Sequence, residues 1–191
     1  MKLHPLIRKA GEEEQLPKWA RCDPKRIKHV RRVSRLMGEW AKALGLSRKQ
    51  VVRWKAAGYL HDALKDAGPE ELRPLADGRW PAKLLHGPAC AERLRRAGVD
   101  DEEFLLAMSY HSTGHPDFGL LADYLYLADY LEPGRTFRRK RRASLREKLP
   151  EDRQRVLKEV IQLRVAGALS NGHEVLLESI HYWNRLVASE E

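Results

Sequence analysis

The sequence has 191 residues, of which 42% are hydrophobic and 33% are charged. This length and composition suit one folded domain with a buried core, and they exclude a largely disordered chain. Lys and Arg outnumber Asp and Glu by 36 to 27, which gives a formal net charge of +9. Such a charge favours anionic partners, whether nucleotides, RNA or an acidic membrane surface, without choosing among them.

The two cysteines, Cys22 and Cys90, are too few for a disulfide framework, and neither lies in a CxxC motif. This pattern is typical of a reducing compartment, so we expect a cytoplasmic protein. No sustained apolar stretch precedes Glu12, and no later segment approaches the length of a membrane span. We therefore expect neither a secretory signal nor a membrane association.

The first long predicted helix covers residues 24–44. Asp23 can cap its first amides, Pro24 suits the first turn, and Gly45 can end it. Its apolar residues recur at steps of three and four, namely Ile27, Val30, Val33, Met37, Trp40 and Leu44. His29 lies directly beside this stripe.

Ser47 and Gln50 form a capping-box pattern that predicts a second helix running to His61 and Asp62. The His-Asp pair therefore lies near the carboxyl end of a helix. Three prolines and two glycines then predict loops over residues 66–83, with one short helix at residues 69–72.

His86 lies just ahead of a helix predicted over residues 88–97, which Gly98 would terminate. A second capping box, formed by Asp100 and Glu103, opens a further helix that runs out at Tyr110 and His111. Both histidines are thus expected at helix ends.

Residues 120–131 are apolar on several sides and predict a largely buried helix, closed by Pro133 and Gly134. Asp129 belongs to this helix. An ionisable side chain in a buried helix needs a partner, so Asp129 is a candidate functional residue.

A basic run, Arg138–Arg142, precedes two further helical patterns over residues 150–169 and 174–187. We interpret this run as the solvated start of a helix, rather than as an anion funnel or an RNA contact. No segment alternates as a strand would, so the chain predicts an all-α fold, a compact helical bundle of one domain over residues 1–191. Trp40, Trp54 and Trp183 lie at helical spacing with other apolar residues and are expected in the core.

Six scattered histidines and aspartates form a candidate metal centre: His29, His61, Asp62, His86, His111 and Asp129. A lone helical His or a terminal Asp is usually structural, so each residue taken singly carries little weight. Their joint order, each at a helix end or beside a buried stripe, favours a shared site. Imidazole and carboxylate without sulfur suit first-row metals and favour a hydrolytic centre over a structural one.

A metal lowers the pKa of its bound water from about 15.7 towards about 7, and a pair of metals can also hold a phosphoryl oxygen. This chemistry indicates hydrolysis of a phosphoric anhydride by attack of metal-bound hydroxide. Lys65, one helical turn past His61, and Arg135, just after the helix of Asp129, are candidate cations for the phosphate charge.

The motifs resemble those of the YqeK-type HD-domain family, whose members hydrolyse diadenosine tetraphosphate symmetrically to two ADP. The resemblance is carried by His29 in KHV and by HDALK at 61–65, LLHGP at 84–88, YHSTG at 110–114 and YLADYLEPGR at 126–135. It implies an HD domain with its metal-site core over about 24–135 and a C-terminal helical extension over about 136–191.

The resemblance also implies roles for single residues. His29, His61, Asp62 and Asp129 match the basic HD metal set, and His86 and His111 match a pair that supports a second metal. Asp62 is the expected bridge between the two, and the expected metal is iron, with manganese, cobalt or zinc as alternatives. The positions expected around the nucleotide phosphates are Lys65, Thr113, Gly114 and Arg135, with Asp62, Lys65 and Arg135 assigned to catalysis.

Two alternatives stay open. The same centre could act on a nucleoside monophosphate, a cyclic nucleotide or inorganic polyphosphate, as a nucleotidase or phosphodiesterase. Alternatively, a basic helical protein could associate with RNA or the ribosome and hold only a structural metal, which would predict salt-dependent binding through Arg138–Arg142. We rank this second alternative lower because it leaves six converging ligands without a function, so nucleic acid is a secondary partner. An oligomer is compatible with the sequence.

Overall fold

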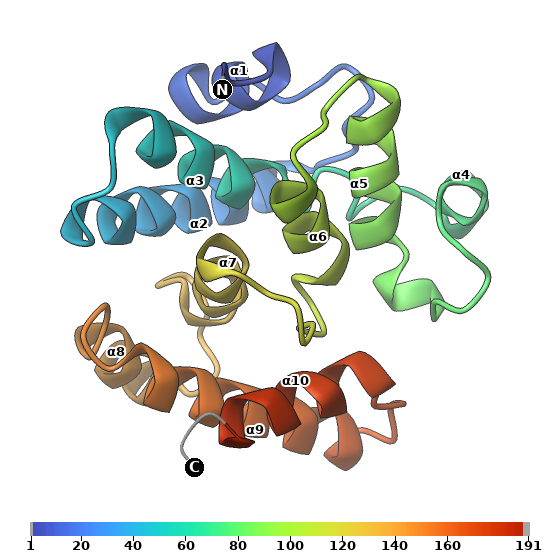
Figure 1. Cartoon of the computed structure of the whole chain (residues 1–191). Coiled ribbons are helices and arrows are strands. Elements are labelled where there is room, and N and C mark those ends of the chain that lie inside the picture. The colour runs from blue at the N-terminus through green and yellow to red at the C-terminus, as the bar shows by residue number, and fades with distance from the viewer. Residues whose placement is uncertain (1, 189–191) are drawn as a thin grey trace.

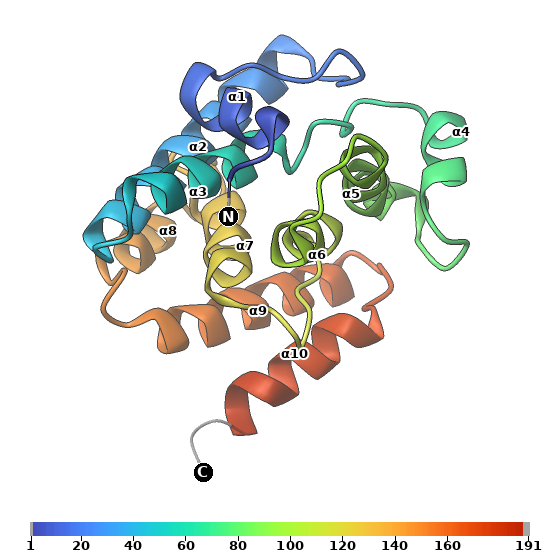
Figure 2. The ribbon, with the colours of Figure 1, turned by 45° about the horizontal axis from the view of Figure 1, so that its top comes forward.

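The structure is a computed structural model that describes residues 2–188. Every regular element in that range is helical, so the predicted all-α class is confirmed. Figure 1 shows α7 between a layer formed by α2 and α3 and a layer formed by α9 and α10. In Figure 2, α5 and α6 lie side by side on the flank of α7, with α4 at the outer edge.

The elements follow one another without a strand among the described residues. They are α1 (Pro5–Glu13), α2 (Pro24–Ala43), α3 (Arg48–Leu60), α4 (Pro69–Leu72), the 3-10 turns η1 (Arg73–Leu75) and η2 (Ala82–Leu84), α5 (His86–Arg96), α6 (Glu102–Tyr110), α7 (Leu120–Leu131), α8 (Arg139–Glu147), α9 (Arg153–Ser170) and α10 (Leu177–Ala188). Helix α2 begins as predicted, because a carboxylate oxygen of Asp23 accepts from the amide of Arg26 at 2.6 Å. Gly45, at φ +68°, follows its end.

Helices α2 and α3 pack closely enough that one position between them must be glycine. A Cβ added to Gly58 would lie 2.7 Å from the Cα and the amide nitrogen of Ser34. Since α3 ends at Leu60, this close approach places His61 and Asp62 beside the first half of α2, where His29 lies.

Two predicted helix starts are wrong in detail. Helix α5 begins at His86 rather than at Pro88. Pro88 fits within the first turn because the amides of that turn have no helical carbonyl to donate to, so the missing N–H of proline removes no helical hydrogen bond. Helix α6 is capped by Asp101 rather than by Asp100. The carboxylate of Asp101 accepts from the amide of Phe104 at 3.1 Å while Arg53 Nε holds it at 2.6 Å.

The starts of the last two helices also differ from the prediction. Helix α9 begins at Arg153, since residues 150–152 form a turn, and α10 begins at Leu177, since residues 173–176 are irregular. The apolar residues keep a helical spacing just before each of these helices, but that spacing alone does not make the residues helical.

Helix α7 is the centre of the fold, with ten of its twelve residues buried. Trp40 and Trp54 pack against the ring of Tyr124 at centroid distances of 5.5 and 5.1 Å, so these tryptophans belong to the core as predicted. Trp183 is partly buried and packs against the same core.

Asp123, on α7, is bound by residues of the C-terminal helices. It accepts from Tyr182 Oη at 2.7 Å and from Arg153 and Arg185 at 3.1 Å each. This buried carboxylate therefore ties α9 and α10 to the central helix.

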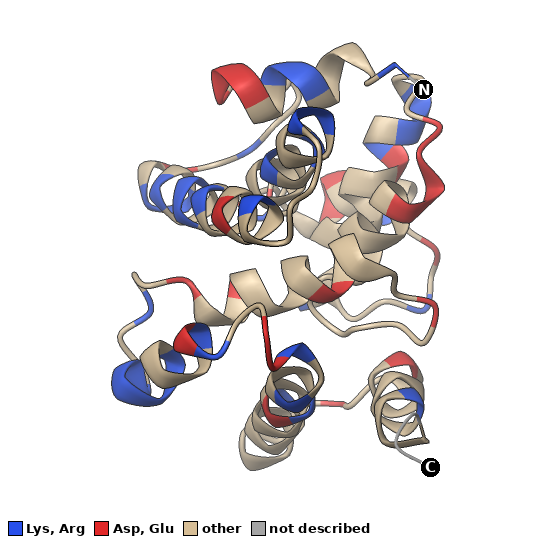
Figure 3. Ribbon diagram, turned by 60° about the vertical axis from the view of Figure 1, so that its left-hand side comes forward, with Lys and Arg blue, Asp and Glu red and all other residues tan. Residues whose placement is uncertain are grey.

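Lys and Arg cover much of α2 and α8 (Figure 3). We interpreted the basic run Arg138–Arg142 as the solvated start of a helix, and its first four residues are exposed. Arg142 is the exception: it is buried, with its guanidinium 4.2 Å from the centroid of the Tyr130 ring. Along residues 2–188, none of the helices combines the length and the apolar character that crossing a bilayer requires.

Candidate metal centre

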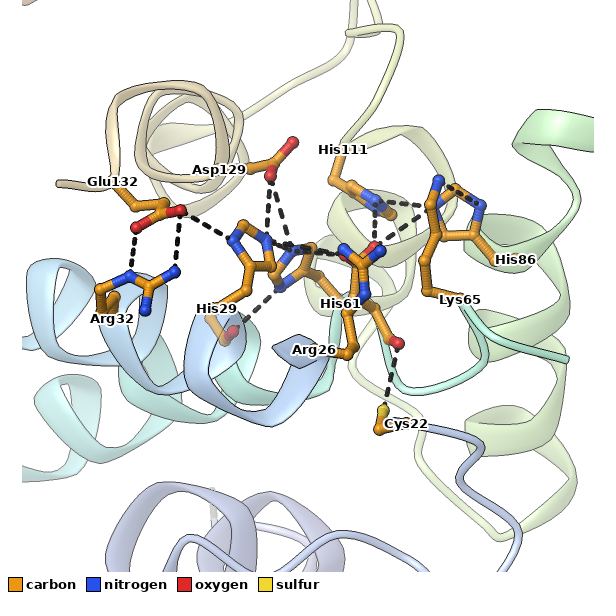
Figure 4. Close-up of polar contacts among 12 residues, drawn as sticks. Cys22, Arg26, His29, Arg32, His61, Lys65, His86, His111, Asp129 and Glu132 are labelled. Carbon is orange, nitrogen blue, oxygen red and sulfur yellow. Dashed lines mark hydrogen bonds and ion pairs between the residues drawn. The ribbon is translucent and has the colours of Figure 1, made fainter. Parts of the chain in front are cut away.

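The structure brings all six predicted ligands together at the junction of five helices. Figure 4 labels the four histidines and Asp129. His29 comes from α2, His61 and Asp62 from the end of α3, His86 from the start of α5, His111 from the end of α6, and Asp129 from α7. All six are buried, with exposed fractions from 0% to 7%. Ionisable groups buried in this way need one another or a bound ion.

Asp62 lies in the middle of the cluster. One of its carboxylate oxygens, Oδ1, lies 3.3 Å from His86 Nε2 and 3.4 Å from His111 Nε2. The other oxygen, Oδ2, lies 3.6 Å from His29 Nε2 and 3.7 Å from His61 Nε2. Each oxygen therefore faces its own pair of histidines, which is the arrangement that a carboxylate bridging two cations requires.

The histidines of each pair point their Nε2 atoms at one another. These atoms are 3.3 Å apart for His29 and His61 and 3.1 Å apart for His86 and His111. Carbonyl oxygens accept from the Nδ1 atoms of His61 at 2.9 Å and His111 at 2.8 Å, so in the neutral rings Nε2 carries a lone pair. The Nε2 lone pairs of His61 and His111 therefore face the interior of the cluster, where a cation can accept them. The donor set thus fits metal ions.

Glu132 orients His29, and sequence reasoning did not single it out. Its buried carboxylate lies 3.2 Å from His29 Nδ1 and accepts from Arg32 Nε at 2.5 Å and from the amide of Gly134 at 2.6 Å. Burial would lower the pKa of His29, but hydrogen bonds to Asp129 and Glu132 outweigh it and raise that pKa. The available signal was the place of Glu132 directly after the buried helix, in the EPGR motif.

Asp129 joins the histidine pair of the α2–α3 side. Its Oδ1 lies 3.2 Å from His29 Nε2 and 3.9 Å from His61 Nε2. Arg135 donates to the same oxygen at 2.7 Å, and Arg164 donates to Oδ2 at 2.9 Å. Arg164 lies in α9, in no recognisable motif, so the sequence carried no signal for it.

Two groups of donor atoms lie close enough to hold an ion each. They are His29, His61 and Asp62, and Asp62, His86 and His111, with the donor atoms of each group within 4.8 Å of one another. Sulfur does not take part: Cys22 Sγ donates to the carbonyl of Asp62 at 3.4 Å, and burial raises the pKa of its thiol to about 12. Nitrogen and carboxylate donors suit first-row divalent ions.

The protonation states also fit metal ligands. Burial lowers the pKa of His61 to about 3 and that of His86 to about 4. Burial would raise the pKa of Asp62, but the charge of His61 and hydrogen bonds from His111 and His86 outweigh it and hold that pKa well below its usual range. Near neutral pH the imidazoles of His61 and His86 are neutral and the Asp62 carboxylate is ionised, which is the form that binds metals.

The predicted phosphate contacts divide into two groups. Lys65 Nζ lies 3.3 Å from both ring nitrogens of His86, and Arg135 contacts Asp129, so both cations adjoin the cluster. Arg26 joins them, donating to Asp62 Oδ2 at 2.6 Å. Arg26 lies one turn before His29 on α2, a spacing that could have indicated it.

Thr113 and Gly114 lie farther along the turn that follows α6. Thr113 is buried and its hydroxyl donates to the carbonyl of Gly114 at 3.1 Å. Gly114 has φ +78°, and an added Cβ would lie 2.2 Å from the Tyr182 ring, so close packing explains this glycine. His115, on the same turn, contacts the Tyr110 ring and accepts from the amide of Asp117.

The model of the HD-domain family matches residues 26–134, more than half of the chain and the whole of the ligand cluster. The chain belongs to the HD-domain family. The His-Asp pair of this HD domain is His61 and Asp62, so the expectation of an HD domain is confirmed.

The chain resembles proteins named symmetrical bis(5'-nucleosyl)-tetraphosphatase. It is 37% identical to that of Bacillus subtilis over 108 residues, 52% of this chain and 56% of the relative. Identity is 38% over 89 residues with that of Staphylococcus aureus, 42% of this chain and 46% of the relative. With the protein of Halalkalibacterium halodurans the identity is 31% over 121 residues, which are 59% of this chain and 63% of the relative. The matches thus span about half of these relatives' length.

A solved structure resembles the chain over a longer range. It is described as a predicted HD superfamily hydrolase involved in NAD metabolism from Clostridium acetobutylicum. The TM-score is 0.76 at 27% identity, and the match covers 87% of this chain and 90% of that one. The likeness therefore extends beyond residues 26–134, the range of the family match.

Proposed function

We propose that this HD domain is a metal-dependent phosphohydrolase that cleaves diadenosine tetraphosphate symmetrically to two ADP. The observation that carries the metal-dependent part is the placement of Asp62, with each carboxylate oxygen facing one histidine pair. The names of the relatives support the substrate.

The proposed ligands of one ion are His29, His61, Asp62 and Asp129, and those of the other are Asp62, His86 and His111. First-row ions held by these ligands would supply Lewis acidity, which makes water a stronger acid and offsets charge on phosphoryl oxygens. We propose iron as the native metal, with manganese, cobalt or zinc as alternatives that the same donors accept.

The chain's own cations then bind the polyphosphate. Lys65 and Arg135 adjoin opposite ends of the ligand cluster, at His86 and Asp129 respectively, and Arg26 lies at Asp62. Their charges would orient the phosphates and offset the negative charge that grows on the leaving ADP. In the proposed reaction the oxygen of water attacks one of the two middle phosphorus atoms. The bond from that phosphorus to the central bridging oxygen breaks, and this oxygen leaves with the second ADP.

Product analysis on anaerobically purified protein tests this proposal. The protein is assayed for bound metal, stripped with a chelator, and reconstituted separately with iron, manganese, cobalt and zinc. We expect about two ions per chain, loss of activity on stripping, and ADP as the sole nucleotide product from diadenosine tetraphosphate. AMP with ATP as products, or undiminished activity after stripping, would reject the proposal.

A different nucleotide substrate is the second candidate. The HD superfamily hydrolase of Clostridium acetobutylicum, which matches most of this chain, is described as involved in NAD metabolism. The same metal centre would then hydrolyse a phosphate bond in another nucleotide. Assays with nucleoside monophosphates, cyclic nucleotides and inorganic polyphosphate beside diadenosine tetraphosphate distinguish the two by their relative kcat/KM.

A further inference from the structure

A cavity of about 450 Å³ opens next to the ligand cluster. One wall is formed by the segment before α5, with Pro81 and Leu84, and by Tyr126 of α7. The opposite wall is formed by α9, with Val165 and Ala168, and by the segment leading into α10. Most of this lining is apolar, in contrast to the charged cluster beside it.

Three lining residues connect the cavity to the metal centre. Arg164 donates to the Asp129 carboxylate at 2.9 Å. The carbonyl oxygen of Lys83 accepts from Lys65 Nζ at 3.5 Å, and Lys65 in turn adjoins His86. Thr113 follows His111 by two residues. The cavity therefore adjoins residues that contact the ligand cluster.

We propose that this cavity binds a nucleoside of the substrate, with its phosphates directed at the metal centre. The proposal rests on the nucleotide substrate of the proposed function and adds the place of the base and ribose. A volume of about 450 Å³ lies within the range of about 300 to 1,000 Å³ that small-molecule sites occupy. Apolar walls suit the faces of a base, while Arg164, which donates to Asp129, brings positive charge to the end of the cavity beside the metal centre.

The proposal gives the C-terminal helices a function. The family match ends at residue 134, whereas Arg164, Val165 and Ala168 belong to α9. The HD core would hold the reacting phosphates, and α9 with the segment before α10 would decide which nucleoside fits. Nucleoside preference would then change through α9 without any change in the metal ligands.

Filling the cavity tests the proposal by direct binding. Ala168 lines the cavity, while Ala166, two residues before it on α9, is exposed and lies outside it. We compare the wild-type full chain with Ala168→Trp and the matched control Ala166→Trp, all loaded with manganese. Isothermal titration calorimetry measures the Kd of ADP and of inorganic pyrophosphate for each protein, and metal content with circular dichroism checks folding.

Wild type and Ala166→Trp should bind ADP at least about tenfold more tightly than pyrophosphate, a difference of about 1.4 kcal/mol. Ala168→Trp should lose this preference. Equal affinities for ADP and pyrophosphate in the wild type, or wild-type ADP affinity in Ala168→Trp, would overturn the proposal. If Ala168→Trp loses helical content, the smaller Ala168→Leu replaces it with the same criteria.

The outcome is separable from that of the proposed function. ADP binding needs no turnover, so a chain that prefers ADP but does not cleave diadenosine tetraphosphate keeps the cavity proposal and loses the substrate. A chain that makes two ADP yet shows no ADP preference over pyrophosphate keeps the substrate and loses the cavity.

Discussion

Asp62 is the residue on which both halves of the ligand cluster depend. It belongs to both groups of donor atoms, and its two oxygens face different histidine pairs. The sequence indicated Asp62 as a bridge through family resemblance, and the geometry now gives that role a physical basis. Its function as a bridge stays a proposal.

Replacement of Asp62 by alanine should abolish turnover. The expected fall in kcat is at least about 100-fold, the loss that removing one electrostatic contact from an active site causes. Helical content, measured by circular dichroism, should stay near that of the wild type. Asp117→Ala is the control, since the Asp117 side chain is 80% exposed; a wild-type rate in Asp62→Ala contradicts the assignment.

Glu132 should act through His29 rather than on the substrate. A carboxylate on the far ring nitrogen fixes the orientation of a metal-binding histidine, and removing such a partner costs about 10- to 100-fold in metal affinity. We expect Glu132→Gln to weaken metal binding by that factor in a chelator competition assay.

Two further measurements separate this role from general destabilisation. Added metal should restore the activity of Glu132→Gln, which a misfolded protein would not show. Glu151→Gln, at an exposed position, should keep the metal affinity of the wild type. An unchanged affinity in Glu132→Gln would remove Glu132 from the metal centre.

At the scale of helices, the ligands gather because several helices end or begin at one place. His61 and His111 each follow the last residue of a helix, and each ring donates to a carbonyl of the final turn. Those carbonyls lack helical partners, so the helix end itself orients the ring. The carboxyl ends of α3 and α6 therefore orient these two ligands.

The cap of α6 gives a stability prediction. Asp101 caps α6 and pairs with buried Arg53 through Nε at 2.6 Å and Nη2 at 2.7 Å. Asp101→Ala removes the cap and leaves Arg53 with Glu103 alone, so the free energy of unfolding should fall by about 3 kcal/mol. Urea denaturation measures the change, and Asp100→Ala is the control because Asp100 is exposed and makes no cap.

The same pair gives the direction of a pH effect. Burial would raise the pKa of Asp101, but hydrogen bonds from Arg53 outweigh it and lower that pKa. The stabilisation is therefore present above the ordinary carboxyl pKa of about 4 and is lost as pH falls through the lowered value. The difference between wild type and Asp101→Ala should shrink in acid; a constant difference would contradict this origin.

At the scale of the whole molecule, the metal centre joins five helices, α2, α3, α5, α6 and α7. Ions bound there would connect segments one hundred residues apart, from His29 to Asp129. Binding to the folded state alone stabilises it by about 2.7 kcal/mol at a ligand concentration one hundred times Kd.

Chelation should therefore lower the unfolding temperature. For a chain of this size the expected shift is about 5 to 10 °C, measured by differential scanning calorimetry and reversed by added metal. Asp62→Ala should show a smaller shift because both ligand groups lose a member. Identical unfolding temperatures with and without metal would mean that the cluster holds no ion.

The sequence by itself determined most of the helices and all six members of the ligand cluster. Both depend on local signals: caps, turn residues, a three- and four-residue apolar period, and short motifs. The errors lie at helix starts, as at His86 and Asp101, and in α1 (Pro5–Glu13), which was not predicted. At α6, Asp100 and Asp101 are neighbouring candidates for the cap, and the contact with Arg53 selects Asp101.

Only the tertiary structure decided how the ligands are paired and what surrounds them. The two faces of Asp62, the bond from Glu132 to His29, the bond from Arg164 to Asp129 and the cavity beside α9 all join residues far apart in the chain. Such contacts leave no periodic trace in the sequence, because they arise from the packing of complete helices against α7. Caps, turn residues and apolar spacing determine the helices, and the packing of those helices against α7 determines the geometry of the metal centre.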